Sequence, residues 1–534
     1  MAAGPHDVRA ELDELLESLQ RKNVRLWVDQ GDLHYLAAPG ALTHQEREAL
    51  RAFKARIVTE VREGGLALSP PPGTQRAPLT QQQRIYLDRM RNGHLQSRRA
   101  PILLQIEGRL NVEAMQCSVR ALVRRHSVLR TRLIQVREEP EQWIDDLRDQ
   151  YLEVLDVTGI PQDVVHQTLK VIIDSLCNER CDVTVGPLFA AKLIKLTPTV
   201  HVLFIAIHHI IFDGSTLALL FRELWSSYGD VALGRGLSVS APPMQNADYA
   251  RWQQLRHHAW MRNHRPYWLK HLAGAQGIRW PRDPIGDTRA NGLACVSLPL
   301  GPTLTNQLRD AAQHARTLPV MALIAVFAAV VSRTCDQKDF VVTTTVHGRD
   351  LPEHEGLAGY CSHSVYLLMQ LRTDERFYDL LRYVTDEFQR AMEHKDFGGI
   401  VEEHPQLRAG TLFQWLPWQR LEEIDASQAQ EGQSDQLKVK RFERPFQFKH
   451  DAYYPDIYDL VWTASNTKNG ILVQIFYRSE MFSATTVAQF ASDFLATAER
   501  LAGDLHEPAV RVAPFDAERV SLREARHSLQ SGGS

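Results

Sequence analysis

The chain has 534 residues, a formal net charge of −3, 44% hydrophobic residues and 23% charged residues. This composition is typical of a globular enzyme, and at about 150 residues per domain the length suffices for three or four domains. The negative charge argues against nucleic acid as the main partner, because such proteins usually present a strongly basic face. With no signal peptide, no apolar run of about 18 residues and no Cys-x-x-Cys pair, the sequence predicts a cytoplasmic protein with reduced thiols and no membrane contact.

Residues 1–65 predict a small separate unit. An apolar stripe on residues 12–19 predicts a first helix, and residues 24–28 and 33–37 predict two strands that flank the tight turn Gln30-Gly31-Asp32. A second helix follows Leu42-Thr43. A core of this size is marginal alone, so we expect the unit to dock or dimerise. Residues 66–77, with Ser69-Pro70-Pro71-Pro72-Gly73, predict an extended linker.

The most informative segment is His208-His209-Ile210-Ile211-Phe212-Asp213-Gly214. It follows a predicted hairpin of strands 188–196 and 200–208 and precedes a predicted helix that ends near Tyr228. Buried imidazoles need hydrogen-bond partners, so the pair indicates either a site or a satisfied polar core. Because side chains alternate along a strand, the two histidines should face opposite sides, and only one should reach a given cleft.

This segment resembles the HHxxxDG motif of the condensation domains of nonribosomal peptide synthetases, which are relatives of chloramphenicol acetyltransferase. Other segments resemble further motifs of that family and occur in the same order: Leu79–Tyr86, Arg125–Leu133 (RHxxLRTxF), Ala247–Gln253 (ADFAxWQ), Tyr267–Leu272 (YWxxxL), Val346–Arg349, Gly359-Tyr360 and His394–Phe397. Together they cover roughly residues 78–503. Two departures stand out: Ser215 replaces a common Trp, and Cys361-Ser362-His363 replaces FVN, so that a histidine stands where the family has asparagine.

The resemblance implies a mixed α/β (α+β) fold of two chloramphenicol acetyltransferase-like lobes, arranged as a V-shaped pseudo-dimer around a tunnel. The first lobe would span residues 78–242 and the second residues 243–505. A segment between Thr411 and Pro445 would cross from the second lobe to the first. Residues 506–534 resemble the linker that leads to an adenylation domain.

The implied reaction is amide-bond formation, in which a carrier-bound aminoacyl amine attacks an upstream carrier-bound acyl or peptidyl thioester. His209 would hydrogen-bond the amine or accept its proton, and His208 would support the loop. We expect Asp213 to be structural and to pair with Arg125, because an unpaired buried carboxylate is costly. Gly214 would permit the tight turn and a close approach of the backbone to the thioester. Arg130 and Trp252 are predicted to support the site, and Ser215, Ser362 and His363 are candidates to line the tunnel.

The N-terminal unit resembles the docking domain of tubulysin-type synthetase subunits, an ααββ-like module, through Leu26-Trp27-Val28, Leu42-Thr43 and Lys54–Val58. Such a module binds the C-terminal tail of the upstream subunit as a strand added to an exposed edge. The candidate docking residues are Lys22, Arg25, Trp27, Arg47, Arg51 and Lys54. For these individual residues, a solvated helix face is the alternative interpretation.

The implied partners are an upstream donor carrier protein with its tail, a downstream acceptor carrier protein and an adenylation domain; homodimerisation of the docking module is also open. Substrates would arrive on phosphopantetheine arms of the carriers, so we expect no directly bound cofactor and no metal. The sequence lacks Gly-x-Ser-x-Gly, His-Glu-x-x-His and P-loop motifs.

Two alternatives remain open. An epimerisation-type relative shares HHxxxDG but normally follows a carrier domain, whereas a docking unit precedes the motif here. A catalytically inactive condensation-like scaffold that only docks a subunit is favoured slightly by the departures at Ser362-His363. A cyclisation domain would have DxxxxD in place of the motif. The sequence does not predict the identity of donor or acceptor.

Overall fold

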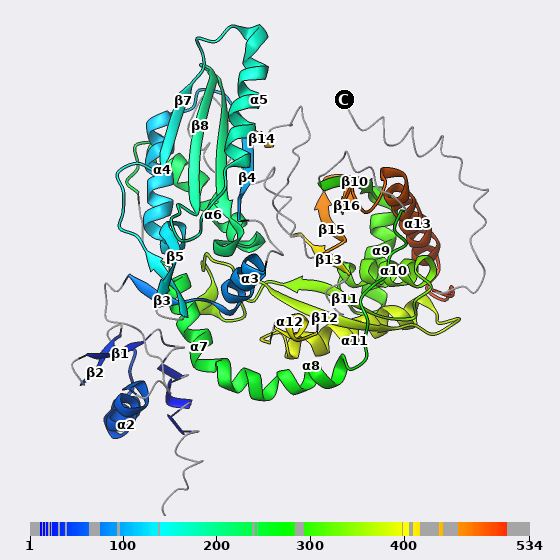
Figure 1. The fold of residues 1–534 in the computed structure, drawn as a ribbon, viewed down its shortest axis with the longest axis horizontal. Helices are drawn as coiled ribbons and strands as arrows, with labels where there is room; N and C mark the ends of the chain where they lie inside the picture. The colour runs from blue at the N-terminus through cyan, green and yellow to red at the C-terminus, as the bar shows by residue number, and fades with distance from the viewer. Residues whose placement is uncertain are drawn as a thin grey trace, which may run out of the picture.

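The computed structural model describes residues 11–12, 14–16, 18–19, 22, 24–29, 32–37, 40–62, 75–92, 97–136, 139–237, 241–242, 244–283, 293–397, 399–404, 410–416, 437–441 and 458–509. Over these residues the chain forms a small N-terminal unit and two larger α/β lobes. The lobes diverge from a common base in Figure 1, which confirms the expected V-shaped pair.

The N-terminal unit has the order predicted from its apolar pattern: a helix, a hairpin and a second helix. The hairpin pairs β1 (Arg25–Asp29) with β2 (Asp32–Leu36), and α2 spans His44–Arg62. Its chain order is therefore αββα, not the ααββ order that the resemblance suggested. The leucines of the first helix, at positions 12, 15, 16 and 19, are buried in the core of the N-terminal unit. Leu255, from the helix at residues 246–263, packs against that core.

The first lobe is built on a five-stranded sheet. Its order is β14 (Lys438–Arg441), β4 (Arg99–Glu107), β9 (Val200–His208), β8 (Phe189–Thr197) and β7 (Leu152–Asp156). Helices α4 (Val112–Arg125) and α6 (Gly214–Ala232) supply the core on one face, and α5 (Gln162–Asn178) packs on the other. β9 is buried along almost its whole length, as its unbroken apolar run predicts.

A smaller sheet adjoins this lobe at the base of the V. It contains β3 (Arg76–Pro78), β6 (Glu139–Ile144) and β5 (Thr131–Val136), and α3 (Gln81–Arg91) follows β3. The lobe thus begins at Arg76, inside the linker predicted for residues 66–77. Residues 63–74, which hold the Ser-Pro-Pro-Pro-Gly run, lie outside the described residues.

The second lobe has a six-stranded sheet. The order is β10 (Leu293–Pro299), β16 (Gly470–Arg478), β15 (Leu460–Thr467), β13 (Thr411–Trp415), β11 (Asp339–Val346) and β12 (His363–Gln370). Its helices are α9 (Gly301–His314), α10 (Pro319–Thr334), α11 (Phe377–Glu393), α12 (Ile400–Glu403) and α13 (Ala484–Gly503). Helices α7 (Asn246–Asn263) and α8 (Arg265–His271) run along the base between the lobes (Figure 1).

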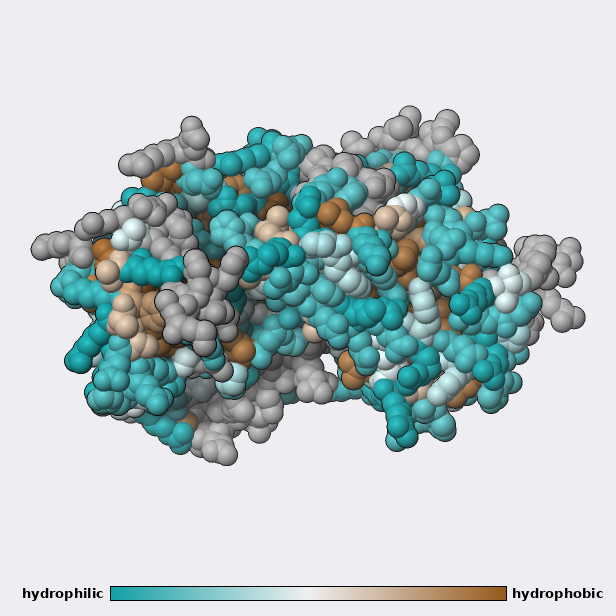
Figure 2. Space-filling model, turned by 90° about the horizontal axis from the view of Figure 1, so that it is seen from below, coloured by the Kyte–Doolittle hydropathy of each residue, from teal (hydrophilic) through white to brown (hydrophobic). Residues whose placement is uncertain are grey.

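Helix α10 is buried without interruption from Met321 to Ser332 and forms the centre of the second lobe's core. No single described helix is long and apolar enough to cross a membrane, although α9 and α10, bent by 102°, pass that test together by length and composition only. The face in Figure 2 is mostly hydrophilic, with hydrophobic residues in small scattered groups.

One strand of the first lobe comes from the second half of the chain. β14 pairs antiparallel with β4, with Val439 opposite Ile106, and Leu437 is buried in the first lobe's core. The crossing segment expected between Thr411 and Pro445 is therefore confirmed. At the C-terminal end, Ala509 is buried in the second lobe's core, and residues 510–534, most of the predicted linker to an adenylation domain, lie outside the described residues.

Candidate active site

The histidine motif forms the turn between β9 and α6. β9 ends at His208, residues 209–211 form a 3-10 turn, and Asp213 caps α6 by accepting a hydrogen bond of 2.9 Å from the Thr216 backbone N–H. His209 therefore lies beyond the strand. The rings of His208 and His209 have different surroundings, as expected. The cause is the 3-10 turn that begins at His209, not the alternation of side chains along a strand.

His208 is fully buried and holds the turn. Its Nδ1 accepts a hydrogen bond of 3.2 Å from the Ile210 backbone N–H, and its Nε2 lies 3.4 Å from Ser97 Oγ. Burial, followed by the neighbouring His209 and Arg99, lowers the pKa of His208 to about 3. The ring is thus a neutral acceptor for the loop at physiological pH.

The His209 ring lies in an aromatic enclosure. It stacks on Phe212 with ring centroids 4.9 Å apart, meets the Tyr360 ring at 4.9 Å and has Tyr86 at 5.7 Å. These neighbours come from its own loop, from the segment before β12 and from α3. Burial lowers the pKa of His209 against the opposing charge of Asp213. At neutral pH the imidazole is therefore uncharged and able to accept a proton.

Asp213 links the two lobes. Arg349 donates from Nη1 and Nη2 to its two carboxylate oxygens at 2.8 and 3.0 Å. The backbone N–H groups of Cys361 and Ser362 and the Ser362 hydroxyl also donate to Oδ2, at 3.0, 3.1 and 3.1 Å. Burial opposes ionisation, but the Arg349 charge and these hydrogen bonds outweigh it and hold the pKa of Asp213 below its ordinary value.

The predicted partner of Asp213 was wrong. Arg125 lies at the end of α4 and pairs with Glu223 of α6, Nε to Oε2 at 3.1 Å, and Glu223 also accepts from His126 at 2.6 Å. Glu223 lies near the middle of α6, ten residues after Asp213, which is about 15 Å along the helix axis. Arg125 therefore pairs with α6 away from the motif. The cation that compensates Asp213 is Arg349, from the Gly-Arg element that the sequence identified without a role.

The residues next to Asp213 only partly match their expected roles. Gly214 opens α6 without a positive φ, so the turn does not depend on left-handed glycine backbone. Ser215 is half-buried in the first turn of α6, and Ser362 is held by its hydrogen bond to Asp213. His363, a tunnel candidate, is only 2% exposed, because its ring lies against Gln82 of the first lobe, whose Nε2 is 3.2 Å from both ring nitrogens. It does not line open space.

Comparison with known proteins agrees with this geometry. The condensation domain family model matches residues 74–518, and the TubC N-terminal docking domain model matches residues 12–62. The chain belongs to the condensation domain family. It is a condensation domain of the nonribosomal peptide synthetase type preceded by a docking domain.

Curated relatives match most of the chain, and solved structures share its fold. Tyrocidine synthase 3 of Brevibacillus parabrevis is 27% identical over 466 residues, which are 84% of this chain but 7% of that protein. The chain thus spans a small part of such relatives. The EpoB cyclization-docking bidomain of Sorangium cellulosum has a TM-score of 0.63 at 18% identity over 93% of this chain and 99% of that one. The X-domain of teicoplanin biosynthesis in complex with OxyB has a TM-score of 0.67 at 21% identity, over 85% and 98%.

Trp252 of this condensation domain lies in a cluster behind the Arg349 loop. Its ring stacks on Tyr249 at 5.5 Å and 16°, with the Arg256 guanidinium 4.6 Å from its centroid. Tyr249 donates from its hydroxyl to the Gly348 carbonyl at 3.4 Å. Trp252 is therefore placed to support the loop that carries Arg349, and does not contact the His209 enclosure through the rings described.

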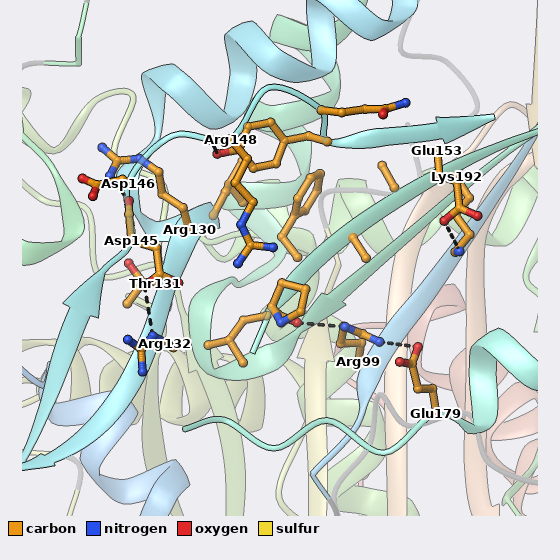
Figure 3. Close-up of a pocket in the computed structure, with 18 residues that line it drawn as sticks. Arg99, Arg130, Thr131, Arg132, Asp145, Asp146, Arg148, Glu153, Glu179 and Lys192 are labelled. Atoms are coloured by element: carbon orange, nitrogen blue, oxygen red, sulfur yellow. Dashed lines mark hydrogen bonds and ion pairs between the residues drawn. The ribbon is translucent and has the colours of Figure 1, made fainter. Parts of the chain in front are cut away.

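Arg130 lies on a cavity of ≈ 410 Å³ in the first lobe, shown in Figure 3. Its Nη1 donates to the Asp145 carbonyl at 2.5 Å, and burial lowers its pKa. All lining residues belong to the first lobe, and their charges largely offset one another: Arg132 pairs with Asp145 at 3.0 Å, Arg99 with Glu179 and Lys192 with Glu153. Arg99, which lines the cavity, is paired with His208 in the register of β4 and β9. Neither His208 nor His209 is among the residues that line the cavity.

Two of the predicted docking cations already have partners within the module. Lys22 pairs with Glu46 at 2.7 Å, and Lys54 with Asp32 at 2.5 Å. Arg47 and Arg51 are exposed on α2. The backbones of Arg25 and Trp27 lie in β1, while their side chains are outside the described residues.

Sequence reasoning missed three contributors to the site. Arg349, Tyr86 and Tyr360 all fall in recognised motifs, but no role followed from the motifs alone. The sequence carried no signal that the two tyrosines would meet His209, because both are distant from it along the chain. Among the described residues, no group of three or more His, Cys, Asp or Glu side chains is placed to hold a metal.

Proposed function

We propose that this condensation domain forms amide bonds: the amine of an acceptor aminoacyl group attacks the thioester of an upstream acyl or peptidyl group, each presented on a carrier protein's phosphopantetheine arm. The observation that carries the proposal is the His209 ring, neutral and enclosed by Phe212, Tyr360 and Tyr86 where the two lobes meet. Substrates that enter between the lobes from opposite faces would meet there.

The reaction depends more on the positioning of the two reactants than on deprotonation of the attacking amine. A free α-amino group has a pKa of about 8, so near pH 7 about one molecule in ten is neutral, a cost of about 1.4 kcal/mol. Holding two tethered reactants in attack geometry contributes about 7 to 11 kcal/mol. A general base adds about 10²- to 10⁴-fold, because the nitrogen must lose a proton as the bond forms.

Each member of the motif has a distinct part in this proposal. The amine nitrogen attacks the thioester carbonyl carbon, the carbon–sulfur bond breaks, and the thiolate leaves on the donor arm. His209 accepts the proton that the nitrogen loses and can return it to the thiolate. His208 holds the turn, Asp213 fixes it to the second lobe through Arg349, and the backbone at Gly214 lies close to where the thioester would be.

We further propose that the docking domain recruits the upstream synthetase subunit. In the described part of the chain the β1–β2 sheet has two strands, so an added strand can extend it at an outer edge. Arg47 and Arg51 of α2 are exposed charges that can attract an acidic tail. Homodimerisation of this domain, a downstream adenylation domain and a cytoplasmic location remain predictions from the sequence.

An inactive scaffold is the second candidate function. The observation that favours it is the loop at Ser362-His363, where the family's asparagine is replaced and the histidine is buried. A structurally similar X-domain is known in complex with OxyB, so this fold also serves to bind another protein. Epimerisation of a carrier-bound residue is a third candidate function, because epimerisation-type relatives share the same motif.

His209→Ala separates these functions. A donor-loaded and an acceptor-loaded carrier protein are mixed with the full chain, and the carrier-bound product is followed by intact mass. We expect the variant to lose about 10²- to 10⁴-fold in rate. His258→Ala, an exposed histidine on α7, is the matched control and should leave the rate unchanged. Absence of a new amide even with the wild-type chain would favour the scaffold, an equal rate for His209→Ala would overturn the role of His209, and inverted donor stereochemistry without a new amide would favour epimerisation.

A further inference from the structure

Three successive glutamines tie the start of α3 to three other elements. The backbone N–H of Gln81 donates to Gln253 Oε1 on α7 at 2.8 Å. Gln82 accepts from Gln253 Nε2 at 3.0 Å and places its own Nε2 3.2 Å from the ring nitrogens of His363 on β12. Gln83 donates to Gln142 on β6 at 3.4 Å. The second lobe thus contributes to fixing a helix of the first.

The same helix carries Tyr86 to the catalytic histidine. Tyr86 is 8% exposed, and its ring centroid lies 5.7 Å from those of both His208 and His209 and 6.1 Å from that of Tyr360. Gln82 and Tyr86 are four residues apart, so they lie on one side of α3 about one turn apart. A displacement of α3 at Gln82 therefore moves Tyr86 relative to His209.

We propose that His363 is a positioning residue: through Gln82 it fixes helix α3 and so holds the Tyr86 ring against His209. The proposal rests on the proposed amide-forming function and adds a residue from the second lobe to its machinery. It also gives a physical role to the position where this chain departs from the family's asparagine.

The surroundings of His363 leave its ring little freedom. A Cβ on Gly348 would lie 2.6 Å from His363 Cδ2, so the ring fills space that only a glycine leaves open. Burial lowers the pKa of His363, although Asp396 lies 4.0 Å from Nε2. A neutral imidazole has one unprotonated nitrogen, which accepts from the Gln82 amide.

The consequence for His209 concerns water. The titratable groups that face it are His208 from β9, Asp213 at the start of α6 with its partner Arg349, Tyr86 from α3, and Tyr360 from the loop before β12. Burial is the largest influence on its protonation. If α3 shifts, water reaches the ring and the pKa of His209 rises toward its ordinary value, which protonates the base at a higher pH.

The test compares His363→Leu, Gln82→Leu, the double variant and His363→Asn. Leucine removes the acceptor, whereas the asparagine amide oxygen stands near the place of Nδ1 and restores it. We expect each leucine variant to lower kcat by between about 10- and 100-fold with little change in KM for either carrier protein. The acid limb of the pH–rate profile should move to higher pH. The double variant should lose no more than either single one, and His363→Asn should recover most of the rate.

Gln337→Leu is the matched control for a purely structural loss. Gln337 is 5% exposed in the second lobe, accepts from Arg279 N–H at 2.7 Å and donates to the Gly277 carbonyl at 3.2 Å, away from α3. It should lower Tm without moving kcat or the pH profile. The positioning role is wrong if His363→Leu behaves like Gln337→Leu, or if His363→Asn is as defective as His363→Leu.

A second readout separates this proposal from the proposed function. NMR titration of labelled histidine, with the His209 signal assigned by His209→Ala, reports the pKa of His209 directly. If the wild-type chain forms no amide, the proposed function fails, yet a higher pKa of His209 in His363→Leu than in the wild type would still establish positioning. An unchanged pKa would overturn the positioning role even in an active enzyme.

Discussion

Arg349 holds Asp213 through two nitrogen–oxygen contacts of 2.8 and 3.0 Å, and the two residues come from different lobes. Asp213 ends the turn between β9 and α6 in the first lobe, whereas Arg349 follows β11 in the second lobe. Both are largely buried, with side-chain exposures of 2% and 12%. The histidine turn is therefore fixed relative to the second lobe, so that any opening of the V at this point must break a buried ion pair.

Loss of Asp213 should destabilise the protein strongly. Asp213→Ala leaves Arg349 buried without its carboxylate and removes the cap of α6, so we expect a loss of about 3 to 5 kcal/mol in the free energy of unfolding. The control is Asp379→Ala, which removes the exposed pair with Arg376 (2.6 Å; exposures 53% and 41%) and should cost at most about 1 kcal/mol. Urea unfolding measures both. Similar losses for the two variants would contradict the interlobe role of Asp213.

Gly348→Ala should damage the loop far more than an ordinary glycine substitution. Gly348 has φ +60°, and an added Cβ would lie 2.1 Å from the Cys361 carbonyl oxygen. Gly234, at φ +70°, has no atom within 4 Å of such a Cβ, so Gly234→Ala pays only the backbone penalty of about 1 to 2 kcal/mol. We expect Gly348→Ala to lower Tm further and to abolish product formation, since the Cys361 N–H and Arg349 both bind Asp213. Equal Tm values would show that the loop relaxes freely.

His208 should make the protein sensitive to acid. The pKa of His208 is about 3 in the folded state, against an ordinary value of 6.5. Between these values the imidazole of the unfolded chain binds a proton, whereas that of the folded chain does not. Stability is therefore full above pH 6.5 and falls as the pH drops toward 3, by about 2 kcal/mol between pH 7.5 and pH 5 from this group. His208→Asn keeps an acceptor near Nδ1 without the titration. We expect a flatter dependence of unfolding free energy on pH for the variant, and parallel curves would refute the assignment.

Charge reversal on α2 should weaken binding of an upstream tail. We expect the double variant Arg47→Glu, Arg51→Glu to raise Kd for a synthetic acidic, strand-forming peptide by roughly tenfold at low salt. Both arginine side chains are exposed on α2, so their replacement turns an attraction for the acidic peptide into a repulsion. The difference should shrink as salt screens the charges. Fluorescence anisotropy measures it. Lys338→Glu with Lys468→Glu, exposed in the second lobe, is the control of equal charge change, and an equal loss there would mean a nonspecific effect.

Local pattern was enough to predict the elements that carry the site. Strand β9 was predicted at residues 200–208 and found there, and the N-terminal hairpin strands were predicted within one residue of their bounds. These segments are apolar runs bounded by turn residues, so their structure follows from burial along a single stretch of chain.

Pairings between distant segments could not be predicted in the same way. Arg349 lies 136 residues from Asp213, and His363 lies 281 residues from Gln82. Nothing in the charge pattern near Asp213 distinguishes Arg349 from Arg125, because the choice depends on how α4 and α6 pack and on how the lobes meet. The low exposure of His363 likewise follows from contact with the other lobe.

The pairing of β14 with β4 of the first lobe has a consequence for the folding of the chain during translation. Lys438, the first residue of β14, follows the end of β4 at Glu107 by 331 residues. At about 5 to 20 residues per second, a ribosome needs roughly 15 to 70 seconds to bridge that distance. During this interval the edge of β4 has no β14 to cover it. A fragment that stops after α6 would keep that bare edge permanently, so shortened versions of this protein should carry residues 437–441 if they are to remain monomeric.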